Sequence, residues 1–193
     1  MPTLSLTDTL TSLSGELCHA LSLLSDAMTA SCFACITHIS ECHRRSTSLT
    51  ADANSYLFSV FCPSLERAPC IRLCEKLHAA VGAVFEVGLR LPATPEPDSR
   101  RAAELQSLCR MGELLHEVIL TLPRYVKGNR PPAPPDTYRF HSEHTKARAA
   151  HALQVMHHDR TAADAAISHA TEQLSLALCE AYTSLLVLVA HSV

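Results

Sequence analysis

The sequence predicts an all-α protein, a bundle of about six helices. Apolar residues recur at steps of three and four almost throughout the chain, which is typical of helices that bury one face. The chain has no tryptophan and 5% aromatic residues, so its core must consist mainly of Leu, Ala, Val and Cys. Five glycines supply too few turn residues for a many-stranded fold. A length of 193 residues suits a single domain.

The first expected helix is long, from about Thr7 to Arg45, because one narrow apolar stripe continues over that range. The stripe consists of Leu17, Leu21, Leu24, Met28, Cys32, Cys35, Ile39 and Cys42. We expect the polar run 46–48 to loosen this helix. A short helix over 52–61 follows, and Pro63 breaks the path after it.

The next helix is expected to start near Ser64, and its apolar spacing continues to Gly88. Residues 91–99 then form a Pro-rich connection, with an N-cap at Asp98 or Ser99. A fourth helix follows, in which Pro123 perturbs the last turn and Lys127–Gly128 is the stop. Its apolar positions are Leu105, Leu108, Gly112, Leu115, Ile119 and Leu122.

Residues 131–135, PPAPP, predict a stiff extended linker. Asp136 can cap a fifth helix that ends near His157, and 161–164 starts a sixth that runs nearly to the end. The C-terminal half of this last helix is apolar on most sides, so we expect it to lie centrally. The chain is therefore expected to be one domain with halves at about 1–91 and 98–193, each with three helical segments.

The net charge and the hydropathy pattern of the chain exclude several classes of protein. The formal net charge is −3, without the basic face of a nucleic-acid binder, so we expect no nucleic-acid partner. The first residues lack the basic and apolar regions of a signal peptide, and no window approaches the roughly 18 apolar residues that span a bilayer. We expect a cytoplasmic protein without membrane insertion, whose nine cysteines are mostly free thiols.

Five cysteines fall on inward positions of the expected helices: Cys32, Cys35, Cys42, Cys70 and Cys74. Free cysteine packs as a small hydrophobe, and a zinc CxxC pair needs a second pair that this chain lacks. Core packing is therefore the favoured interpretation. The alternative is a thiolate site that joins Cys35, His38 and Cys42 to a neighbouring helix.

Two Glu-x-x-His pairs are candidate metal ligands: Glu75 with His78, and Glu113 with His116, the second followed by Glu117. At this spacing both side chains share one helix face, as in the di-metal carboxylate bundles. The apolar stripes place the glutamates outward and the histidines at the flank. Solvated pairs are thus favoured, and the alternative is a surface site for iron, zinc or manganese. A di-metal oxidase would require both pairs to face inward.

The fifth expected helix carries His144, His151 and His158 at seven-residue spacing, with Arg148 between the first two. A polar outer face is the favoured interpretation. The alternatives are a transition-metal patch or a site that accepts anions when the imidazoles are protonated. The chain has no P-loop, nucleophile elbow, HExxH or Gly-rich dinucleotide loop, so its motifs do not indicate catalysis.

Residues 58–86 resemble a segment of the PhoU-like proteins, particularly their phosphate-transport accessory branch. The matching positions are Phe61, Pro63, Leu65, Glu66, Arg67, Leu73, Leu77 and Glu86. The resemblance implies a bundle of two three-helix halves. It also implies a non-enzymatic regulatory or accessory role in phosphate transport or its regulation. We expect a homodimer whose partner is a membrane transporter or a signalling protein.

The chain departs from this family at its metal-binding signature, which pairs an acidic residue with an Asp four positions on. Ser46 and Thr47 stand where an acidic residue is expected, and His78 and Ala79 stand where Asp-Asp is expected. Two interpretations stay open: Glu75 and His78 form a substitute site on the outer face, or the metal function is lost.

Overall fold

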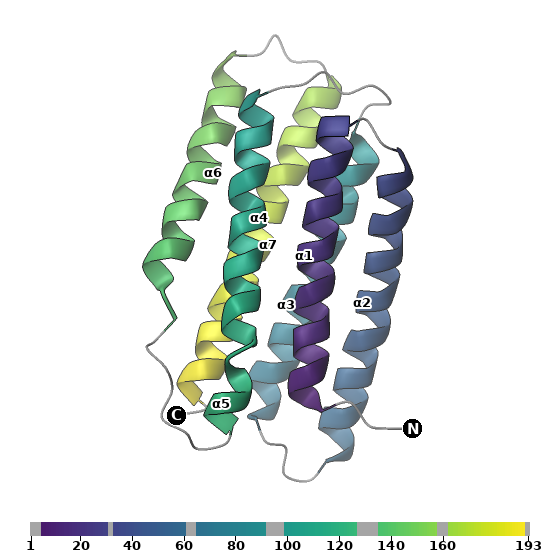
Figure 1. The fold of residues 1–193 in the computed structure, drawn as a ribbon, viewed down its shortest axis with the longest axis vertical. Helices are drawn as coiled ribbons and strands as arrows, with labels where there is room; N and C mark the ends of the chain where they lie inside the picture. The colour runs from purple at the N-terminus through teal and green to yellow at the C-terminus, as the bar shows by residue number, and fades with distance from the viewer. Residues whose placement is uncertain are drawn as a thin grey trace.

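A computed structural model describes residues 5–30, 33–60, 65–91, 99–126, 135–157 and 162–191. These ranges are almost entirely helical and contain no strand, which confirms the predicted all-α bundle. Six long helices lie side by side, with a short additional one, α5 (Figure 1). The helices are α1 (Leu6–Ala30), α2 (Phe33–Ser59), α3 (Arg67–Arg90), α4 (Ser99–Ile119), α5 (Leu122–Val126), α6 (Thr137–His157) and α7 (Ala162–His191).

The N-terminal helices are divided differently from the prediction. α1 and α2 are separate, so a single helix over 7–45 is wrong, and α2 includes most of the expected short helix. The periodicity hid the break because α1 and α2 pack on each other with similarly spaced apolar faces. The run 46–48 does not interrupt α2, which continues through it. The hydroxyls of Ser46 and Thr47 donate to the His43 carbonyl oxygen at 2.8 and 3.0 Å.

The helices after α3 agree well with those predicted from the sequence. Asp136 caps α6, because its Oδ1 accepts a hydrogen bond from the Arg139 backbone N–H at 3.1 Å. A turn at 120–121 separates α4 from α5, and Pro123 lies in the first turn of α5, where its missing N–H costs little. The expected features at 61–64, 92–98, 127–134 and 158–161 lie outside the described residues.

Four helices form the centre of the bundle, and one flanks each side. α3 packs most extensively on α7, α1 contacts both α3 and α4, and α4 contacts α7. α2 packs on α1 and α3 at one edge, and α6 packs mainly on α4 at the other (Figure 1). One group of three long helices consists of α1, α2 and α3, and the other consists of α4, α6 and α7. The groups therefore join through the contacts of α1 with α4 and of α3 with α7.

The predicted role of cysteine as a core residue is confirmed where the structure describes it. Cys35, Cys42, Cys70 and Cys74 are buried, whereas Cys32 lies outside the described residues. None of the described cysteines forms a disulfide within the described residues. They complete a core composed mainly of leucine side chains.

The last helix, α7, lies centrally as expected. Its buried side chains include Leu174, Leu178, Ala181, Tyr182, Leu185 and Leu188. The expectation that no segment approaches a membrane span needs correction, because Ala162–Ala190 is long and apolar enough by length and composition. Half of its most apolar 18-residue window is buried inside the protein, as in the core helix of a bundle.

Candidate functional site

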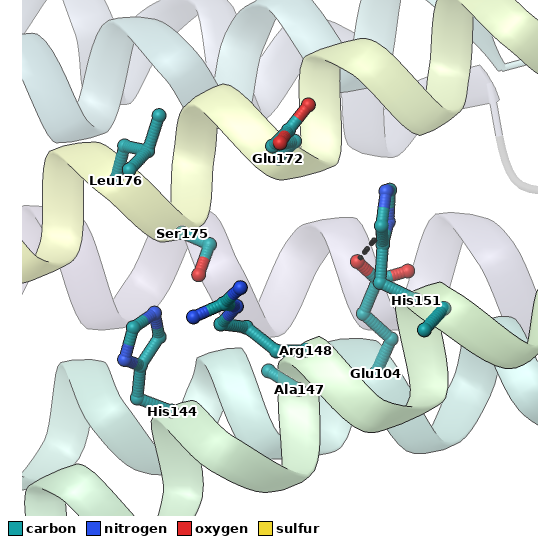
Figure 2. A pocket seen from close by; sticks show the side chains of 9 residues that line it. Glu104, His144, Ala147, Arg148, His151, Glu172, Ser175 and Leu176 are labelled. Carbon is teal, nitrogen blue, oxygen red and sulfur yellow. Dashed lines mark hydrogen bonds and ion pairs between the residues drawn. The ribbon is translucent and has the colours of Figure 1, made fainter. Parts of the chain in front are cut away.

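A pocket of about 380 Å³ lies between α6 and α7, and α4 contributes one side chain to it (Figure 2). α6 contributes His144, Arg148 and His151, which face α7 across the pocket. The complete lining is Glu104, His144, Ala147, Arg148, His151, Ala152, Glu172, Ser175 and Leu176.

The pocket exists because small residues lie where two helices would otherwise pack closely. The buried positions of α6 are Phe140, Ala147 and Gln154, spaced by seven residues. Phe140 fills its position and stacks on Tyr182 of α7, with ring centroids 3.8 Å apart. Two turns later the buried position is Ala147, whose side chain is only a methyl group, and Ser175 of α7 is also small. The space between the helices is therefore left for polar side chains from the flanks of α6.

A buried carboxylate lies at the base of the pocket. Glu104 is 2% exposed, and its Oε1 lies 3.0 Å from His151 Nδ1. Gln154 Nε2 donates to Oε2 of the same carboxylate at 3.0 Å. Burial raises the pKa of Glu104, while the charge of His151 and hydrogen bonds from His151, Gln154 and Thr171 act in the opposite direction. Glu104 thereby fixes the orientation of the His151 ring at the pocket wall.

Hydrogen-bond donors gather at the other end of the pocket. Arg148 extends toward α7, and no carboxylate lies within ion-pair distance of it in the described part of the chain (Figure 2). Burial lowers the pKa of His144, and the charges of Arg148 and His141 lower it further. The His144 imidazole is thus neutral at neutral pH and can donate one hydrogen bond.

Ser175 is the least satisfied group in the pocket. Its side chain is 8% exposed, and its hydroxyl has no hydrogen-bond partner within the described ranges. The hydroxyl faces the side of the pocket where His144 and Arg148 lie (Figure 2). A buried hydroxyl without a partner costs about 1–3 kcal/mol, so this position favours a bound group that supplies one.

Together these groups are chemically suited to an anion. A guanidinium offers a planar fork of N–H donors that suits carboxylate and phosphate oxygens. Ser175 adds a hydroxyl from the opposite helix, and His144 adds a ring N–H. Glu172 lies on the same wall as Ser175 and supplies negative charge, which favours a small anion of low charge over a polyanion.

The expectation that the fifth helix shows an outer polar face is corrected here. His144 and His151 are half-buried and line the α6–α7 pocket, and His158 lies outside the described residues. Both histidines lie beside the buried positions Ala147 and Gln154 on α6, which turns them toward α7. Sequence reasoning missed Glu104, although it lies on the apolar stripe of α4 at helical spacing from Leu108.

The five predicted metal ligands lie on two helices, in separate surroundings. On α3, Glu75 is exposed and His78 is half-buried against α2, with its Nδ1 2.9 Å from Ser46 Oγ. The His78 ring also stacks on His43, with centroids 5.1 Å apart. This arrangement confirms the outward phase of the glutamate and the flank position of the histidine.

On α4, His116 is half-buried and its Nδ1 lies 2.7 Å from Ser14 Oγ of α1. Glu113 and Glu117 are exposed, and both pair with Arg110. Among the described residues, these side chains do not join Glu75 and His78 in a cluster with metal-ligand separations. A metal site at these five residues stays a prediction.

The described residues form a helical bundle with a polar pocket between α6 and α7. Comparison with models of known families finds no match, and comparison with curated proteins finds none. The resemblance of residues 58–86 to PhoU-like proteins therefore stays a prediction from the sequence.

Proposed function

We propose that this protein is a regulatory or accessory helical bundle, not an enzyme, that binds a small anion between α6 and α7. The observation that carries this proposal is the buried Ser175 hydroxyl, which lies beside the exposed Arg148, because neither side chain has a partner among the described residues. A carboxylate or phosphate group would accept hydrogen bonds from both side chains.

Ligand binding would connect two helices that otherwise touch only partly. α6 packs mainly on α4 and makes a smaller contact with α7. An anion held by Arg148 on α6 and Ser175 on α7 would hold these helices together. The position of α6 would then report whether the pocket is occupied, which suits a regulatory protein.

Inorganic phosphate is the first ligand to test, because residues 58–86 resemble the PhoU-like proteins. In this proposal the protein acts in the cytoplasm, as a homodimer, on a membrane transporter or a signalling protein. Its regulatory signal would be the occupancy of the pocket.

Isothermal titration calorimetry of the full chain tests the proposal, with inorganic phosphate and acetate in separate titrations. We expect at least one anion to bind, and Arg148→Gln to weaken that binding by about tenfold or more through loss of a charge-assisted contact. Ser175→Ala should weaken it less.

Arg139→Gln is the matched control, since Arg139 is an exposed arginine of the same helix outside the pocket lining. It should leave the affinity unchanged. The proposal fails if neither anion binds the native chain at millimolar concentration, or if the two arginine variants bind equally well.

A further inference from the structure

A second cluster of chemically active side chains lies between α1 and α2, away from the anion pocket. Glu16 and His19 are three residues apart on α1 and share one face of that helix. Cys42 of α2 faces them, and the ligand atoms of the three side chains lie within 4.8 Å of one another. A carboxylate, an imidazole and a thiol are the three side-chain types that bind zinc.

The distances in this cluster match a single metal ion. Cys42 Sγ lies 3.6 Å from His19 Nδ1. A tetrahedral zinc ion with Zn–S of about 2.3 Å and Zn–N of about 2.0 Å separates its sulfur and nitrogen ligands by roughly 3.6 Å. The thiol and the imidazole are therefore already placed at ligand separation on two different helices.

A positively charged side chain already lies over the cluster. Arg45 Nη2 donates to Glu16 Oε2 at 2.9 Å and lies 3.5 Å from Cys42 Sγ. Arg45 Nε lies 2.9 Å from Glu16 Oε1, an ion pair in which, among the described residues, this buried nitrogen has no well-aligned hydrogen bond. Glu41 is a second carboxylate, 4.0 Å from Arg45 Nη1, and its two oxygens already accept hydrogen bonds from Arg44 at 2.6 and 2.9 Å, so Arg45 can move only to a shared acceptor.

We propose that Glu16, His19 and Cys42 form a transition-metal site of the zinc type, with a fourth position open to water. On binding, the Cys42 thiol loses its proton to solvent and the thiolate coordinates the metal, while Arg45 leaves Glu16 and shares Glu41 with Arg44. The thiolate and imidazole favour zinc over magnesium or calcium, which prefer oxygen ligands. This site is separate from the predicted ligands Glu75, His78, Glu113, His116 and Glu117.

Titration of the full chain with Co²⁺ tests this proposal, because cobalt replaces zinc and reports its ligands by absorption. We expect a thiolate-to-cobalt charge-transfer band and the strong visible bands of tetrahedral cobalt. Cys42→Ser should abolish the charge-transfer band. His19 is exposed, so His19→Ala should leave the fold intact and weaken cobalt binding by about tenfold or more.

Two matched controls make the result specific. His38→Ala removes an exposed histidine of α2 outside the cluster, and Cys74→Ser removes a buried cysteine outside it. Both should retain the band and the affinity of the native chain. The proposal is overturned if the native chain shows no charge-transfer band, or if His19→Ala binds cobalt as tightly as His38→Ala.

Discussion

Glu104 and Ser175 are buried polar residues in a part of the bundle where apolar packing would be expected. The Glu104 carboxylate accepts hydrogen bonds from Gln154 and lies beside His151, whereas the Ser175 hydroxyl has no partner in the described structure. A buried polar group without a hydrogen-bond partner destabilises the folded state, so the two residues contribute differently to stability. Glu104 stabilises the pocket wall, and Ser175 is available to a ligand.

The first prediction concerns Glu104. Glu104→Ala should lower the free energy of unfolding by about 2–4 kcal/mol, because Gln154 and His151 lose their shared acceptor. Glu104→Gln keeps the size and one acceptor oxygen, and burial disfavours the charged form of the native residue. It should therefore cost about 1 kcal/mol or less. Urea denaturation measures both, and equal losses would argue against the hydrogen-bonding role.

The second prediction concerns the pH dependence of anion binding. The folded protein holds His144 neutral at pH 7, because burial and the charge of Arg148 lower its pKa. Because the pKa is lowered, protonation of His144 requires a more acidic pH than a free imidazole does, and it adds a positive charge to the pocket, so anion affinity should rise as the pH falls. Sulfate is the suitable probe, since its charge is constant over this range. His144→Asn should flatten the profile, and an equally steep profile in this variant would contradict the assignment.

At the scale of helices, the close approach of α1 and α4 depends on a glycine. A Cβ atom added at Gly112 of α4 would lie 2.5 Å from Leu21 Cδ1, and Leu21 is buried in the core. A Cβ at Gly15 of α1 would meet no heavy atom within 4 Å. Both glycines are helical, so their difference isolates the packing contribution.

The third prediction compares these two positions. Gly15→Ala should raise the free energy of unfolding by about 0.5–1 kcal/mol through reduced backbone entropy of the unfolded chain. Gly112→Ala gains the same entropic stabilisation, but Leu21 must repack at a cost of about 1–3 kcal/mol. The free energy of unfolding of this variant should therefore fall. Thermal or urea unfolding distinguishes them. Equal stabilisation by both would show that the α1–α4 contact is looser than described.

The helices were predictable from the sequence where a local signal, such as hydrophobic periodicity or a capping residue, was clear. They were less predictable where the structure depends on how several helices pack together. Periodicity identified the class of fold and the inward cysteines, and the capping residue after the Pro-rich run identified the start of α6 at Asp136. Periodicity failed at the α1–α2 boundary, because no glycine or proline marks the break. The pocket was only partly predictable, since Glu104, Arg148 and Ser175 come from three different helices.

At the scale of the whole molecule, the contacts between the two groups of helices are as important as those within them. α3 and α7 belong to different groups and share the most extensive contact in the bundle. Buried leucines of both helices contribute to one continuous core. The protein is therefore expected to be stable as a unit rather than as two independent halves.

The fourth prediction is a single cooperative unfolding transition. Far-UV circular dichroism, which follows the helices, should give the same urea midpoint as tyrosine fluorescence, which includes the buried Tyr182 beside Phe140. Two transitions with different midpoints would indicate that α1–α3 and α4–α7 unfold separately.

The most direct test of the anion-binding proposal is a ¹H–¹⁵N NMR titration of the full chain with inorganic phosphate and, separately, acetate. The account predicts that for at least one anion the largest amide shifts lie on α6 around Arg148 and on α7 around Ser175. It also predicts that Arg148→Gln removes these shifts. The absence of shifts with both anions, or shifts concentrated on helices remote from this pocket, would contradict it.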